Sequence, residues 1–324
     1  MTRLARCWIG AAVVLALASL PADAQQVRRS YRVGILNEAW AANHPTVEGL
    51  KAGLRELGLE EGRDVTFDIR FTEGKPEATP GVAAALVKSN VDLIFTSNEA
   101  AALAAKAATE KIPVVFTLVG DPVAAGIVTQ LAHPEANLTG VSSLTTELVA
   151  KRLEALKTLI PTLRRVFAFY HGADVPSSAA IVRALEMAPR LGLEVIPQTV
   201  TAPGQLDELL RKLRPGDALL APDIATMDIP AVILEASLAS RIPAVFSADL
   251  WVTHGGLVSY GAEYRAQGMQ AARLVAKILR GTRPQDLPVE AAEKISLAVN
   301  LKTASLMGIT VPRKMLLRAD MLRR

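Results

Sequence analysis

Cysteine is nearly absent from this chain of 324 residues, which holds one cysteine, Cys7. Cys7 precedes a largely apolar run, residues 8–20, whereas a lipid-attached cysteine would directly follow such a run. Once that run is removed, the chain has no thiol nucleophile, no disulfide and no cysteine-ligated metal site. The chain has four histidines, His44, His133, His171 and His254. They are far apart in sequence and lack the spacing of metal ligands. We therefore expect neither a metal nor a cofactor.

Several signatures of catalysis and of nucleic-acid binding are also missing. The sequence has no Gly-x-Ser-x-Gly elbow, no Gly-x-x-x-x-Gly-Lys phosphate loop and no His-Glu-x-x-His pair. The 36 lysines and arginines are scattered, whereas nucleic-acid binding requires a concentrated basic stripe. We predict a protein that is not an enzyme and has no nucleic-acid partner.

The N-terminus carries the pattern of a secretory signal peptide. Arg3 and Arg6 form a short basic region, residues 8–20 are apolar, and Ala22-Asp23-Ala24 supplies the small residues that a signal peptidase needs. The apolar run is shorter than the roughly 20 residues that cross a bilayer, which disfavours a membrane anchor. We predict a signal peptide over residues 1–24, cleavage after Ala24, a periplasmic location and no stable membrane insertion after cleavage.

From residue 31 onward, short apolar runs alternate with amphipathic segments. Uniformly apolar runs between helical segments are typical of a parallel sheet that helices cover on both faces. The predicted strands of the first half are residues 31–37, 65–71, 91–96 and 113–117. The predicted helices are residues 44–59, 76–89 and 98–110. The fold class is therefore predicted to be α/β.

The second half of the chain repeats parts of the first. Lys111-Ile-Pro-Val-Val-Phe-Thr117 returns as Arg241-Ile-Pro-Ala-Val-Phe-Ser247, and Leu57-Gly-Leu-Glu60 returns as Leu191-Gly-Leu-Glu194. Two looser pairs fall in the same order with nearly the same spacing. Such a long period indicates two α/β units rather than a solenoid.

A helix predicted over residues 263–279 follows the second unit and belongs to neither copy. If it packs back on the first unit, the chain crosses between two lobes more than once, which makes a hinge. We predict that lobe 1 contains residues 25–141 and 261–286. Lobe 2 is predicted to contain residues 142–260 and 287–324.

Seven segments together resemble a known family. They are Gly53-Leu-Arg-Glu-Leu-Gly58, Glu61-Gly-Arg-Asp-Val65, the alanine-rich residues 100–106, Gly120-Asp-Pro-Val123, Asn137-Leu-Thr-Gly140, residues 255–261 and Asn300-Leu-Lys-Thr-Ala304. From about Val33 to the C-terminus, the chain resembles the ABC transporter substrate-binding family whose better-known members bind tryptophan and related aromatic amino acids. It departs from them at Asn98-Glu99, where family members often carry Thr-Pro or a similar pair.

The resemblance implies a type I periplasmic-binding fold with two Rossmann-like lobes and parallel sheets joined by a multi-strand hinge. The lobes would close on a small amino-acid-like or carboxylate ligand in the manner of a Venus flytrap. The partners implied are that ligand and the membrane subunits of an ABC importer, which would recognise the closed form.

A ligand crevice in such folds lies outside the carboxyl ends of the parallel strands. Small polar residues and a few aromatic residues occupy the predicted strand ends of both units. The candidate ligand-binding residues are Asn37, Thr96, Ser97, Asn98, Thr117, Asp121, Ser142, Tyr170, Asp223, Ser247, Asp249 and Tyr260. The candidate stacking surfaces for an aromatic ring are Tyr170, Trp251, Tyr260 and Trp40, although any single one of them is more often a core or rim residue.

Thr96-Ser97-Asn98 joins an apolar strand to a helix. Free backbone N–H groups and the positive end of the helix dipole would point into the crevice there and could bind a ligand carboxylate. The alternative is that Ser97 or Asn98 serves only as an N-cap. Glu99 suits the dipole but would repel a carboxylate if it pointed inward. Asp121 has a capping alternative too, because Pro122 favours a first helical position.

Two other functions remain open at this point. A catalytic triad can be dispersed in sequence, so an exported α/β hydrolase is one alternative. Its conceivable members are Ser97 or Ser247, His171 or His254, and Asp223 or Asp249. The second alternative is the ligand-binding module of a sensory system, although no signalling domain is present.

Overall fold

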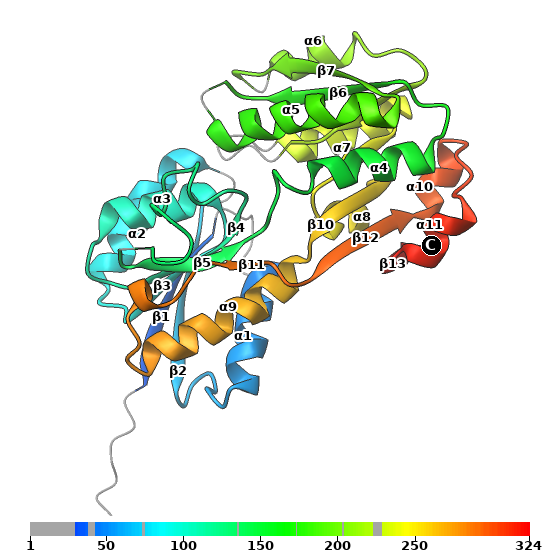
Figure 1. Ribbon diagram of the computed structural model, residues 1–324. Helices are drawn as coiled ribbons and strands as arrows, with labels where there is room; N and C mark the ends of the chain where they lie inside the picture. The colour runs from blue at the N-terminus through cyan, green and yellow to red at the C-terminus, as the bar shows by residue number, and fades with distance from the viewer. Residues whose placement is uncertain are drawn as a thin grey trace, which may run out of the picture.

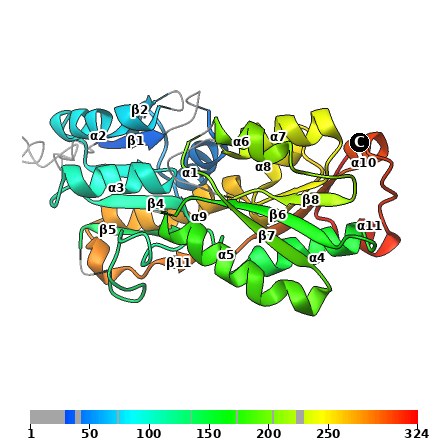
Figure 2. The same cartoon turned by 90° about the horizontal axis from the view of Figure 1, so that it is seen from above.

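The computed structural model describes residues 30–37, 43–72, 75–134, 136–172, 174–202, 204–222 and 229–324. The predicted signal peptide, Trp40 and Asp223 lie outside these residues. Within them, no helix has both the length and the apolar character needed to cross a membrane. The chain forms two lobes that lie side by side (Figures 1 and 2).

The first lobe contains a six-stranded sheet in the order β11-β5-β4-β3-β1-β2, and its paired strands are parallel. The strands are β1 (Tyr31–Asn37), β2 (Val65–Phe71), β3 (Leu93–Thr96), β4 (Val114–Val119), β5 (Leu138–Ser142) and β11 (Glu290–Ala291). The helices are α1 (Pro45–Glu56), α2 (Thr79–Lys88), α3 (Glu99–Ala108) and α9 (Tyr264–Leu279), with 3-10 turns η1 (Pro76–Ala78) and η3 (Pro284–Asp286). The predicted strands and helices of the first half are thus present.

The second lobe contains a seven-stranded sheet in the order β13-β12-β10-β9-β8-β6-β7, in which only the β10–β12 pair is antiparallel. The strands are β6 (Arg165–Tyr170), β7 (Glu194–Thr199), β8 (Asp217–Leu220), β9 (Ala244–Phe246), β10 (Val258–Ala262), β12 (Ile295–Asn300) and β13 (Met321–Arg323). The helices are α4 (Val149–Leu159), α5 (Val175–Met187), α6 (Gln205–Leu210), α7 (Ile229–Ser240), α8 (Asp249–Thr253), α10 (Leu301–Leu306) and α11 (Arg313–Arg318), with the 3-10 turn η2 (Ala188–Leu191). The two parallel-dominated sheets confirm the predicted fold class.

The chain passes between the two sheets three times. β5 belongs to the first sheet, whereas α4 packs on β10 of the second. β10 is followed by α9, which packs on α1, and β11 of the first sheet is followed by β12 of the second. The lobe boundaries expected after residues 141, 260 and 286 stay predictions, and β11 lies in the first sheet beyond residue 286.

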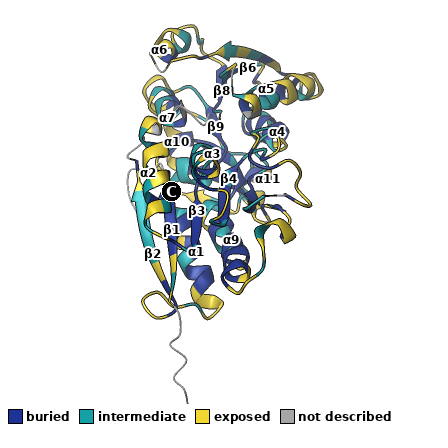
Figure 3. Cartoon of the chain, turned by 90° about the vertical axis from the view of Figure 1, so that its left-hand side faces the viewer, coloured by how far each residue is buried: buried dark blue, intermediate teal, exposed yellow. Residues whose placement is uncertain are grey.

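Buried apolar strands form the centre of each lobe, between the helices (Figure 3). In the first lobe, α1 and α9 cover one face and lie against each other, so the helix after the second unit does pack on the first (Figure 1). A Cβ atom added at Gly49 would lie 2.0 Å from the Arg265 carbonyl oxygen, and one at Gly268 would lie 2.0 Å from that of Thr46. Only glycine permits such an approach of two backbones.

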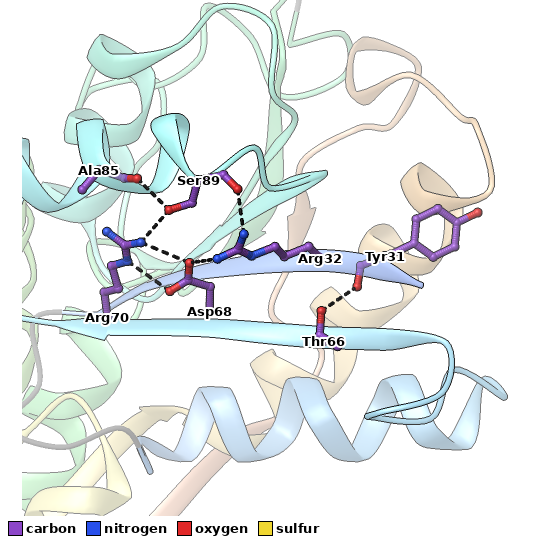
Figure 4. Close-up of polar contacts among 7 residues, drawn as sticks. All are labelled: Tyr31, Arg32, Thr66, Asp68, Arg70, Ala85 and Ser89. Carbon is purple, nitrogen blue, oxygen red and sulfur yellow. Dashed lines mark hydrogen bonds and ion pairs between the residues drawn. The ribbon is translucent and has the colours of Figure 1, made fainter. Parts of the chain in front are cut away.

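A polar network fastens the edge strand β2 to β1 and α2 (Figure 4). The Asp68 carboxylate accepts hydrogen bonds from Arg32 at 2.7 Å and from Arg70 Nε at 3.0 Å. Arg70 also donates to Ser89 Oγ at 2.6 Å, and Ser89 Oγ donates to the Ala85 carbonyl at 2.9 Å. The hydrogen bond from Arg70 is the largest cause of a lowered pKa for Asp68. The network ties the sheet edge to the neighbouring strand and helix.

Candidate ligand-binding site

A layer of buried polar side chains lies where the strands of the first sheet end. It contains four of the predicted ligand contacts, Asn37, Thr96, Ser97 and Thr117. Ser97 Oγ donates to Asn37 Oδ1 at 2.8 Å, and Thr117 Oγ1 donates to the Thr96 carbonyl at 3.1 Å. The fold brings these residues together because parallel strands end at one edge of a sheet. We call this edge the polar edge of the first lobe.

Helix α3 begins at the polar edge, directly after Asn98. Asn98 is its N-cap, since Asn98 Oδ1 accepts a hydrogen bond from the Ala101 amide at 2.8 Å. The capping alternative is confirmed for Asn98, and its contact with a ligand stays a prediction. Glu99 is half-buried in the first turn, where its negative charge complements the helix dipole.

The side chains of Asp121 and Ser142 both form hydrogen bonds with backbone groups of the first lobe. Asp121 Oδ1 accepts hydrogen bonds from the amides of Val123 and Ala124 at 3.1 and 3.0 Å, as a cap would, although residues 122–126 form a turn and not a helix. Ser142 Oγ donates to the Gly120 carbonyl at 3.0 Å at the beginning of the first crossing. A ligand contact by either residue stays a prediction.

In the second lobe, the remaining candidates lie at or near strand ends but in different surroundings. Ser247 is buried directly after β9, and Tyr170 is half-buried at the end of β6, where it packs on the core. Asp249 is the first residue of α8. Burial, followed by the negative charge of Glu263, raises the pKa of the Asp249 carboxyl group. Glu263 itself forms an ion pair with Lys294 at 2.7 Å, which joins the second crossing to the third.

Two aromatic candidates have neighbours within the second lobe. Tyr260 lines a small hollow between α4 and α11, together with Lys151, Leu297 and Met315. Trp251 stacks on Phe246 with ring centroids 6.0 Å apart, and this pair belongs to the core under α7 and α8. Core packing therefore accounts for Trp251, as the sequence allowed.

Residues of α1 and α9 that the sequence analysis did not select also reach the polar edge. His44 caps α1 and stacks on Tyr264, the first residue of α9, with ring centroids 5.6 Å apart. Burial lowers the pKa of His44 to about 4, so its ring is neutral at pH 7. Gln267, one turn into α9, accepts a hydrogen bond from the Leu118 amide directly after Thr117, at 3.4 Å. No local pattern could place Gln267 beside β4, because the two segments are far apart in sequence.

Ser97 and His254, two of the conceivable catalytic residues, make contacts other than those of a triad. Ser97 Oγ donates to Asn37 rather than to a histidine. The His254 ring lies 2.8 Å from the Leu250 carbonyl oxygen at the end of α8. Across the described ranges, no group of three or more His, Cys, Asp or Glu side chains is placed to hold a metal ion.

A family model described as ABC transporter substrate binding protein matches residues 40–322. The chain belongs to this family. Its members are extracytoplasmic, bind small-molecule ligands and act with the membrane subunits of a transporter. Two lobes around a polar edge are consistent with that role.

Individual relatives share both sequence and fold with this chain. A tyrosine-binding protein of Clostridioides difficile is 26% identical over 266 residues, which cover 80% of this chain and 76% of the relative. The crystal structure of a conserved domain protein from Vibrio cholerae has a TM-score of 0.82 and 28% identity, and the match covers 91% of this chain and 100% of that one. A Streptococcus pneumoniae ABC domain in complex with L-Trp has a TM-score of 0.79 and 24% identity over the same shares, which shows a shared fold.

Proposed function

We propose that this protein captures an amino acid through its free carboxylate, between the two lobes, for an ABC importer. The observation that carries the proposal is the polar edge. Three helices of the first lobe, α1, α3 and α9, begin at this edge, where buried hydroxyl and amide groups also gather. Helix amino termini carry partial positive charge and unpaired N–H groups, so together they favour an anionic group.

The relatives support the same class of ligand. One is named for tyrosine, and the solved structure of another holds L-Trp.

Capture would proceed by closure of the lobes. Contacts that a ligand makes with both lobes exist only in the closed form, so the ligand shifts the equilibrium towards that form. The importer's membrane subunits would recognise the closed molecule. The signal-peptide pattern supports export to the periplasm and cleavage after Ala24. The bond between Ser97 and Asn37 supports a binding role over hydrolysis.

The test uses residues 25–324 and titration calorimetry against the twenty standard amino acids. We expect measurable binding of at least one of them, with L-tyrosine and L-tryptophan as the first probes. Tyramine and tryptamine, which lack the carboxylate, should bind at least about tenfold more weakly, since hydrogen bonds to a charged group are worth about 1.5–3 kcal/mol. Equal binding of an amino acid and its decarboxylated amine would contradict the carboxylate part of the proposal.

A further inference from the structure

Some buried polar atoms have no hydrogen-bond partner in the described part of the chain, and they occur in both lobes, the polar edge included. At the polar edge they include Thr72 Oγ1, Thr96 Oγ1 and Gln267 Nε2. Their residues are 4%, 0% and 1% exposed, so bulk water does not reach them freely. A buried donor left unpaired costs about 1–3 kcal/mol, and such groups are rare in native proteins. Of the three at the polar edge, the donor of Gln267 has an orientation that a second contact determines.

The orientation of the Gln267 side chain is fixed by its contact with the backbone. The Leu118 amide is a donor, so the atom that faces it must be the Gln267 oxygen, Oε1. The side-chain NH2 group therefore points away from Leu118 and offers its protons elsewhere. Leu118 has a φ of 56° and lies where the register between β4 and β5 shifts, directly after Thr117. Gln267 thus supports an irregular strand end and keeps a free donor beside it.

A second glutamine on the same helix shows what a purely structural role looks like. Gln270 is 6% exposed, close to the value for Gln267. Its Nε2 donates to Glu290 Oε2 at 2.8 Å and to the Ala291 carbonyl at 2.9 Å. Its Oε1 accepts from the Glu293 amide at 3.1 Å. Gln270 is satisfied at both ends, whereas the NH2 group of Gln267 is left unpaired in the described part of the chain.

We propose that Gln267 binds the ligand, with its Nε2 donating a hydrogen bond to a carboxylate oxygen. This inference rests on the proposed function and assigns α9, the helix that follows the second crossing, a direct part in the site. Gln267 stands in the first turns of α9, next to the start of α1, where Thr46 and Gly268 touch. Its side-chain amide therefore lies beside Leu118, directly after Thr117, at the polar edge.

Two substitutions separate ligand binding from support of the strand end. Gln267→Met keeps the length of the side chain and removes both polar atoms. Gln267→Glu keeps an acceptor for the Leu118 amide but replaces the donor by an oxygen that repels a carboxylate. Gln270→Met is the matched control, because it removes a buried and fully bonded glutamine one turn further along. Melting temperatures without ligand, and affinities for the tightest-binding standard amino acid, are measured for all four proteins.

We expect both Gln267 variants to bind about tenfold or more weakly than the wild type, which corresponds to one lost hydrogen bond to a charged group. Gln270→Met should melt at a lower temperature and keep its affinity within about twofold. Full affinity in Gln267→Glu would overturn the proposal, since support of Leu118 alone would then explain the residue. Wild-type protein that binds none of the twenty amino acids would overturn the proposed function, and this inference with it.

Discussion

At the scale of single residues, His44 makes the stability of the folded protein depend on pH. Its pKa is lowered from 6.5 to about 4 by burial, so the folded protein binds fewer protons at His44 than the unfolded chain. The contribution of His44 to the free energy of unfolding is fully present above about pH 6.5. It falls between pH 6.5 and 4 and changes no further below pH 4. We expect His44→Asn to remove about 1–3 kcal/mol of this acid destabilisation, at about 1.4 kcal/mol per pKa unit and allowing for partial burial. Urea unfolding at pH 7 and pH 4.5 measures the difference.

Asparagine suits this test because it is a good N-cap and keeps the start of α1. The control is His254→Asn, which makes the same substitution at an exposed histidine after α8. If His44→Asn lost as much stability between the two pH values as the wild type, the buried neutral ring would not be the cause.

The sequence predicted single residues best where one local pattern decides their position. Asn37, Thr96, Ser97 and Thr117 follow apolar runs, and the structure gathers all four at one edge. Gln267 and His44 could not be found in this way, because contacts with segments distant in sequence give them their environment. Trp251 shows the converse, since its ring packs in the core although its position in the sequence suited a site.

At the scale of elements, the contact of α1 with α9 depends on small residues. A methyl group at Gly268 would meet the Thr46 carbonyl oxygen at 2.0 Å, so the two helices would have to separate. We expect Gly268→Ala to destabilise the protein by about 1–3 kcal/mol, the usual effect of overpacking. Gly81→Ala is the control, because Gly81 lies in α2 with no atom within 4 Å of an added Cβ. That change should be neutral or stabilise by up to about 1 kcal/mol.

Thermal and urea unfolding of the two variants check this expectation. Equal stability of Gly268→Ala and the wild type would mean that the helices can move apart at no cost. The sequence predicted both helices, over residues 44–59 and 263–279. It could not reveal their close approach, because a glycine inside a helix is ambiguous until its partner is known.

At the scale of the whole molecule, the internal repeat and the leftover helix were enough to predict two lobes and a hinge. The β10–β12 pair was not foreseen, because residues 288–299 match no part of the repeat. The crossing segments show a further feature of the backbone. Leu144, in the first crossing, has a φ of 55°, a left-handed conformation that is uncommon for leucine. Its amide donates to Ser142 Oγ at 3.3 Å, which holds the turn in place.

Such a turn restricts how the lobes can move relative to each other, and glycine would loosen it. We expect Leu144→Gly to widen the unliganded protein in small-angle scattering and to weaken amino-acid binding several-fold, because the closed form becomes less populated.

Arg241→Gly is the control, since Arg241 has a φ of 54° but precedes β9 within the second lobe. Both variants should melt at similar temperatures, whereas only Leu144→Gly should change affinity. The wild type should become more compact with ligand and melt at a higher temperature. Scattering and affinity that are the same for Leu144→Gly and Arg241→Gly would show that the first crossing does not control closure.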